Sequence, residues 1–118
     1  MKDSELKPII QNAILTKDAA LFKAIQMIYS HQTESEKFIG STEDKNGVGF
    51  SVTDDRILSS FARQIDAWRT GMNDYRKPLT FTQIKVARKL VPKYWRQLVP
   101  AARIKLKEKE NLDGRNTT

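Results

Sequence analysis

The sequence predicts an all-α fold, a small single-domain bundle of four to five helices over residues 1–110. Apolar residues recur at helical spacing in several segments. Most of these segments open on residues that cap helices. A length of 118 residues corresponds to one domain, which can bury about two thirds of its unfolded surface. We expect a polar loop around residues 32–50 and a disordered tail over residues 111–118.

The composition excludes several classes of protein. Because the chain has no cysteine, it has no disulfide or thiolate metal site, which fits a reducing compartment. No apolar run approaches the roughly 20 residues that cross a bilayer. The opening MKDSELKP also lacks the apolar run of a signal peptide. We therefore expect a soluble, cytoplasmic protein with no membrane partner.

Two helices are predicted in the first third of the chain, a short one capped by Asp3 or Ser4 and a second over residues 18–31. Their inner faces are apolar: Leu6, Ile9, Ile10, Ala13 and Ile14 in the first, and Leu21, Phe22, Ile25, Ile28 and Tyr29 in the second. A single bent helix is an alternative. These faces are interpreted as core.

The polar segment that follows ends in the motif NGVGF at residues 46–50. Asn46 and Gly47 tolerate positive φ and predict a tight turn that lets Val48 and Phe50 enter the core. A phosphate-binding loop is disfavoured, because the full glycine pattern and its lysine are absent.

A third helix is predicted between Thr53 and Gly71. Asp54 and Asp55 suit the positive end of that helix, and glycine is a common C-terminal cap. Its inner stripe is apolar and comprises Ile57, Leu58, Phe61, Ala62, Ile65 and Trp68.

The stretch LTFTQIKVARKLVPKYWRQL, residues 79–98, combines an apolar face with a basic one. Thr80 and Gln83 have the spacing of a capping box. Pro92 interrupts the pattern and predicts a kinked helix or, alternatively, two short helices. Pro100 marks the start of a further helix.

Charge is distributed unevenly along the chain. Residues 1–55 hold six Lys/Arg and nine Asp/Glu, whereas residues 56–118 hold fifteen and five. Cations interleaved with aromatic residues are typical of nucleic-acid binding. Trp95, next to Arg88 at the border of the basic face, is the aromatic residue we expect at a partner surface. The predicted nucleic-acid site comprises Arg63, Arg69, Arg76, Lys77, Lys85, Arg88, Lys89, Lys93, Trp95 and Arg96.

Catalytic chemistry has little support in the sequence. His31 is the only histidine and lacks the partners of a general base or a zinc site. Asp54 and Asp55 are adjacent on a helix, so they do not converge on one metal ion. We expect no catalytic residue, no metal and no cofactor. A helix-turn-helix is also disfavoured, since the gap from Gly71 to Leu79 is too long.

Two segments together resemble a small module of phage- and plasmid-encoded proteins, some of them helicase-like. The pattern comprises NGVGF at 46–50, Asp54, Ser60-Phe61-Ala62, Leu79-Thr80 with Gln83, Arg88-Lys89, and Lys93-Tyr94 with Gln97-Leu98. Pro92 departs from it. The resemblance implies a mobile-element setting and nucleic-acid metabolism.

The sequence therefore predicts a non-enzymatic accessory protein that binds the phosphate backbone of nucleic acid, DNA rather than RNA, in phage or mobile-element metabolism. The alternative is a protein-interaction module that docks on an acidic surface of a replication or transcription protein. The oligomeric state is left open.

Overall fold

The computed structural model describes residues 1–39 and 49–116, with side chains for residues 1–32 and 49–111. Within these ranges five α-helices and one 3₁₀ helix follow in order: α1 (Asp3–Thr16), α2 (Asp18–Ile39), α3 (Val52–Arg69), α4 (Phe81–Leu90), η1 (Val91–Tyr94) and α5 (Trp95–Asn116). Within the described ranges there is no strand, which confirms the all-α prediction.

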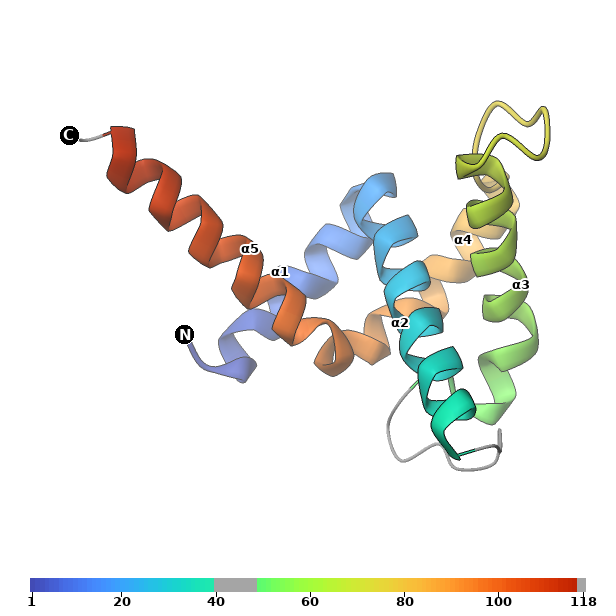
Figure 1. Cartoon of the computed structure of the whole chain (residues 1–118), viewed down its shortest axis with the longest axis horizontal. Helices are drawn as coiled ribbons and strands as arrows, with labels where there is room; N and C mark the ends of the chain where they lie inside the picture. Colours follow the sequence, from blue (N-terminus) through green and yellow to red (C-terminus); the bar gives the residue numbers. More distant parts are fainter. Residues whose placement is uncertain (40–48, 117–118) are drawn as a thin grey trace.

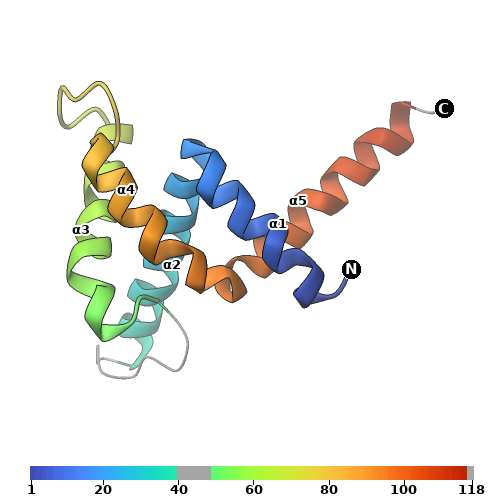
Figure 2. The same ribbon diagram turned by 180° about the vertical axis from the view of Figure 1, so that it is seen from behind.

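The helices form a bundle from which α5 projects (Figures 1 and 2). Helices α2 and α3 lie side by side, and η1 packs against α1, α2, α4 and α5. The radius of gyration is 15.6 Å, above the roughly 13.5 Å typical of this length, because α5 extends away from the other helices. None of the helices in the described ranges is long and apolar enough to cross a membrane.

The core is built mainly from the predicted apolar stripes, although Ile57 of the third-helix stripe is 38% exposed. Of the first-helix stripe, Leu6, Ile10 and Ile14 are buried, whereas Ile9 is 48% exposed. Phe50 is fully buried, as the sequence predicted, and Val48 lies outside the described residues. Other fully or nearly fully buried side chains come from α2, α3, α4, η1 and the loop before α4: Leu21, Ile25, Ile28, Leu58, Ile65, Leu79, Ala87 and Val91.

Helices α1 and α2 are separate, because Lys17 takes an extended conformation with φ −124° and ψ 120°. The predicted capping by Asp3 or Ser4 was wrong, since Lys2 is the N-terminal cap residue and makes no side-chain cap bond. Helix α2 continues to Ile39. The prediction of a polar loop from residue 32 was therefore wrong for residues 32–39. Gln32 is buried and bonded to other elements, which sequence polarity does not reveal.

The capping box predicted at the start of α4 is present. The Thr80 hydroxyl accepts from Gln83 N, and the Gln83 side chain accepts from Thr80 N. The apolar face behind it is buried through Ile84 and Ala87. This box fixes where α4 begins and therefore where its basic residues lie.

Pro92 lies at the start of η1, a 3₁₀ turn that separates α4 from α5. Leu90 and Trp95, which flank η1, keep right-handed helical angles, so α4 and α5 are joined without a loop. Pro100 lies inside α5, so the start predicted there was wrong. Helix α5 also continues to Asn116, past residue 110, where we expected a disordered tail to begin.

Candidate nucleic-acid interface

Three of the predicted cations lie exposed along α4 and the start of α5. Lys85, Lys89 and Arg96 belong to no ion pair in the described part of the chain. Lys85 Nζ lies 5.4 Å from the centre of the exposed Phe81 ring. These ammonium and guanidinium groups are free to contact phosphates.

Arg88 has a structural position instead. Its Nε donates to the carbonyl of Ile14 at 3.1 Å, and its NH2 donates to Asp18 Oδ1 at 2.7 Å. The guanidinium therefore contacts the last turn of α1 and the first residue of α2. A cation at a helix C-terminus is favourable there. These bonds hold α4 against the α1–α2 junction.

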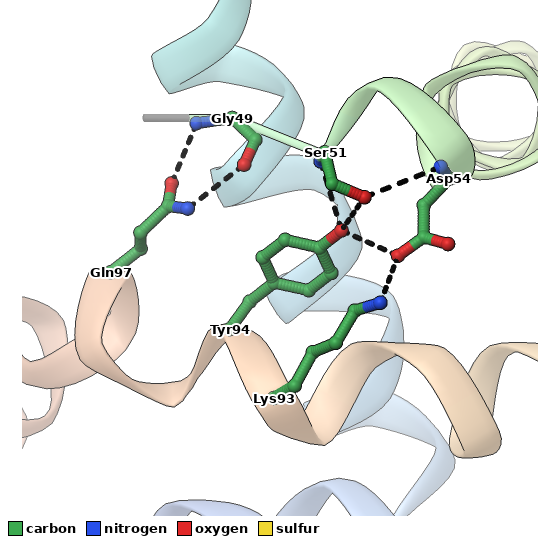
Figure 3. Close-up of polar contacts among 6 residues, drawn as sticks. All are labelled: Gly49, Ser51, Asp54, Lys93, Tyr94 and Gln97. Atoms are coloured by element: carbon green, nitrogen blue, oxygen red, sulfur yellow. Dashed lines mark hydrogen bonds and ion pairs between the residues drawn. The ribbon is translucent and has the colours of Figure 1, made fainter. Parts of the chain in front are cut away.

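Lys93 also has a structural partner, although its side chain is 54% exposed, because its ammonium group joins a network around Tyr94 (Figure 3). Its Nζ lies 2.6 Å from Asp54 Oδ2, and the Tyr94 hydroxyl donates to the same oxygen at 2.5 Å. Ser51 N donates to the Tyr94 oxygen at 2.9 Å. Asp54 is only 4% exposed, and a buried carboxylate needs partners that compensate its charge. Lys93 and Tyr94 are those partners. We call Gly49, Ser51, Asp54, Lys93, Tyr94 and Gln97 the Tyr94 network.

The network shifts the ionisation of its members. Burial acts to raise the pKa of Asp54, but hydrogen bonds from Lys93 and Tyr94 and the charge of Lys93 outweigh it and lower that pKa below 3.8. The bond to Asp54 raises the pKa of Lys93 above 10.5. Burial and the same carboxylate raise the pKa of Tyr94 above 10.0. The ion pair is therefore charged at neutral pH, with Tyr94 protonated.

Gly49 completes the network on the other side of Tyr94. The Gln97 amide donates to Gly49 O and accepts from Gly49 N, each at 2.9 Å. Gly49 has φ +78°, and an added Cβ would lie 2.5 Å from Gln32 Cβ. Only glycine satisfies both conditions. The next residue is held too, because Phe50 N donates to Gln32 Oε1 at 2.9 Å.

The network accounts for much of the pattern that resembles phage and plasmid modules. Gly49 and Asp54 come from its first segment, and Lys93, Tyr94 and Gln97 come from its second. Since they bond to one another, their joint presence has a structural reason. No ligand is needed to explain these positions.

Trp95 is half-buried against the core. Lys7 Nζ lies 5.7 Å from its ring centre, and the Arg96 guanidinium lies 5.3 Å from it. One cation thus comes from α1 and the other from α5. The ring that the sequence assigned to a partner surface packs within the protein itself.

The remaining four predicted residues line two different grooves. Arg63 and Arg69 line a groove of about 450 Å³ between α2 and α3, together with Tyr29 and Asp66. Arg76 and Lys77 line a groove of about 480 Å³ on the α4 side of α3. The ten predicted residues therefore do not form one face. Four of the predicted cations that have no ion pair in the described part of the chain lie on α4 and the loop before it: Arg76, Lys77, Lys85 and Lys89.

The exposed aromatic residues are ones that the sequence prediction left out of the site. Tyr75 is 62% exposed and Phe81 is 72% exposed. Both had a detectable signal: Tyr75 lies in the polar linker MNDYRKP, and Phe81 falls outside the apolar stripe of its helix. Tyr75 lies in the loop before α4, and Phe81 is the first residue of that helix.

No cluster of three or more His, Asp or Glu that could hold a metal ion occurs within the described ranges. His31 is half-buried near the middle of α2. Asp54 and Asp55 point to different partners, the first to Tyr94 and the second to Gln32 and Ser59. Their positions are explained by the fold.

A search of protein families, curated proteins and solved structures found no match to this chain. The resemblance to phage and plasmid modules therefore stays a prediction.

Proposed function

We propose that this protein binds nucleic acid without catalysis, as an accessory factor of phage or mobile-element metabolism in the cytoplasm, with DNA as the ligand rather than RNA. The observation that carries the proposal is the group of exposed cations without ion pairs around α4. These are Arg76, Lys77, Lys85 and Lys89 among the residues whose side chains are described. We call this group the α4 basic surface.

The sequence around this surface supports an anionic partner. Residues 56–105 contain twelve Lys/Arg and two Asp/Glu, the acids being Asp66 and Asp74. A surface with so few acids attracts phosphates over a distance of about 10 Å at moderate salt. Each phosphate that a cation neutralises releases counterions, which supplies most of the binding free energy in sequence-tolerant complexes.

The test is fluorescence anisotropy with labelled single-stranded DNA, duplex DNA and RNA at two salt concentrations. Four phosphate contacts predict that affinity for duplex DNA falls roughly 100-fold between about 50 and 200 mM salt. Absence of binding to all three ligands at low salt would disprove the proposal.

A matched pair of variants locates the surface. Lys85→Ala with Lys89→Ala removes two charges from the α4 basic surface and should weaken binding by about tenfold. Lys2→Ala with Lys17→Ala removes two charges from exposed positions at the ends of α1. The control should keep most of the affinity. Equal losses in both variants would show that net charge matters and that the assigned surface does not.

The alternative function, docking on an acidic protein surface, is supported by a different part of the molecule. A hollow of about 160 Å³ lies where α1, α2 and α5 meet. Its lining is mostly apolar, with Lys23 and Lys105 as the only charged members among the residues described: Ile10, Ala13, Ile14, Ala20, Lys23, Ala24, Met27, Leu98, Ala101, Ala102 and Lys105. Binding to an acidic replication or transcription protein that persists in high salt would favour this function.

A further inference from the structure

Tyr75 is held by its backbone on both sides while its ring is exposed. Trp68 Nε1 donates to the Tyr75 carbonyl at 2.9 Å, and Tyr75 N donates to Asn73 Oδ1 at 3.1 Å. The residue is nevertheless 62% exposed. Because these bonds already hold the backbone of Tyr75, stacking of a flat ligand on its ring requires little further loss of backbone conformational entropy.

Tyr75 lines the groove of about 480 Å³ described above, which we call the Tyr75 groove. This volume lies within the range of small-ligand sites. Arg76 and Lys77 line it too, and the described residues offer them no ion-pair partner. An aromatic face beside two free cations matches a nucleotide, in which a planar base is attached to a phosphate.

The polar groups of the groove are already bonded to one another. Gln64 Nε2 donates to Pro78 O at 3.1 Å and to Gln83 Oε1 at 2.9 Å. Gln83 Nε2 donates in return to Gln64 Oε1 at 3.1 Å. Both N–H groups of the Gln64 amide are used in this way, and one of the two on Gln83, so one amide donor of this pair is left to contact a base edge. A base in this groove would be bound mainly by its face, and every base has one.

We propose that the Tyr75 groove binds an unpaired base of single-stranded nucleic acid by stacking, with Arg76 and Lys77 on the neighbouring phosphates. This inference rests on the proposed function and adds that the nucleic acid is bound as a single strand. In a duplex the base faces are covered by their neighbours, so only a single strand or an unpaired end can use the ring. Phe81, 72% exposed with Lys85 5.4 Å from its ring centre, offers a second aromatic face.

The experiment compares three ligands of equal length, about twelve nucleotides, which is within the range that one small domain covers. They are an oligothymidylate, an abasic strand with the same phosphates, and a hairpin duplex. Wild-type protein should bind the oligothymidylate roughly five- to hundredfold more tightly than the abasic strand, since each stacked base contributes to affinity.

Variants of Tyr75 assign that difference to the ring. Tyr75→Ala should lose most of the preference for the oligothymidylate over the abasic strand and bind the abasic strand as wild type does. Tyr75→Phe should keep the preference. Met72→Ala is the matched control, because Met72 is 81% exposed in the same loop but has no ring. Thermal unfolding of each variant checks that the substitution has not destabilised the bundle.

Two results would overturn the inference while the proposed function stands. One is equal wild-type affinity for the oligothymidylate and the abasic strand. The other is a Tyr75→Ala variant that weakens binding to the duplex as much as to the single strand. If wild-type protein binds none of the three ligands, the proposed function and this inference both fall.

Discussion

In the Tyr94 network and in the α4 basic surface, cations lie next to an aromatic residue in the chain, but the cations have opposite uses. In the first, Lys93 and Tyr94 meet the buried carboxylate of Asp54. In the second, Arg76 and Lys77 follow the exposed Tyr75 and have no ion-pair partner in the described part of the chain. A cation next to an aromatic residue is therefore not a binding signal by itself. The presence or absence of a buried acid decides its use.

The largest expected effect concerns Gly49 in the Tyr94 network. Gly49→Ala should destabilise the fold by about 3 kcal/mol, because it combines a positive φ with a Cβ placed 2.5 Å from Gln32 Cβ. Urea unfolding measures the change. Gly71→Ala is the control, since it has φ +74° but open space around the Cβ, and it should cost about 1 kcal/mol. Equal costs would mean that the contact with Gln32 is relieved without loss.

The next effect compares the two tyrosines. Tyr94→Phe should destabilise the protein by about 2 kcal/mol, because Asp54 loses a donor and Ser51 N loses its acceptor in a buried place. Tyr75→Phe should change stability by less than about 0.5 kcal/mol, since its ring is exposed. Thermal or urea unfolding of the two variants gives the answer. A stable Tyr94→Phe variant would show that water replaces the hydroxyl.

The two lysines should separate stability from binding. Lys93→Ala leaves Asp54 buried without its cation and should cost about 1 kcal/mol, a value kept small because the Lys93 side chain is 54% exposed. Lys85→Ala should leave stability unchanged and weaken nucleic-acid binding about threefold. Unfolding and anisotropy measured on both variants test this. If Lys93→Ala weakens nucleic-acid binding more than Lys85→Ala does, the assignment of Lys93 to stability and Lys85 to binding is wrong.

The smallest effect is the pH dependence of the network. Because the pKa of Asp54 is lowered in the folded state, its contribution is present above about pH 4 and is lost as pH falls through the folded pKa. The pKa values of Lys93 and Tyr94 are raised, so their contributions are present below about pH 10 and are lost as pH rises further.

Unfolding measured across this range should give a plateau between the two limits. Asp54→Asn should remove the part of the acid-side loss that belongs to this carboxyl and reduce the alkaline loss as well. An unchanged acid limb in the variant would assign the loss to other carboxyl groups.

Much of the fold was predictable because local rules determine it. The capping box at Thr80 and Gln83 and the burial of Phe50 follow from residues near in sequence. The roles of Arg88 and Lys93 do not, because Arg88 bonds to Ile14, 74 residues away, and Lys93 pairs with Asp54, 39 residues away (93 − 54). Asp54 was explained as a helix-start acid, and that reading is true but incomplete. Whether an exposed cation has a partner requires the tertiary structure.

The projection of α5 has a consequence for exchange of its backbone amides with solvent. Its first turns carry buried residues such as Leu98 and Val99, whereas residues 107–111 are exposed. A short helical stretch without packing is only marginally stable in water. Deuterium uptake should therefore rise along α5 in the direction of its C-terminus. The residue at which protection begins would mark how much of this helix the bundle supports.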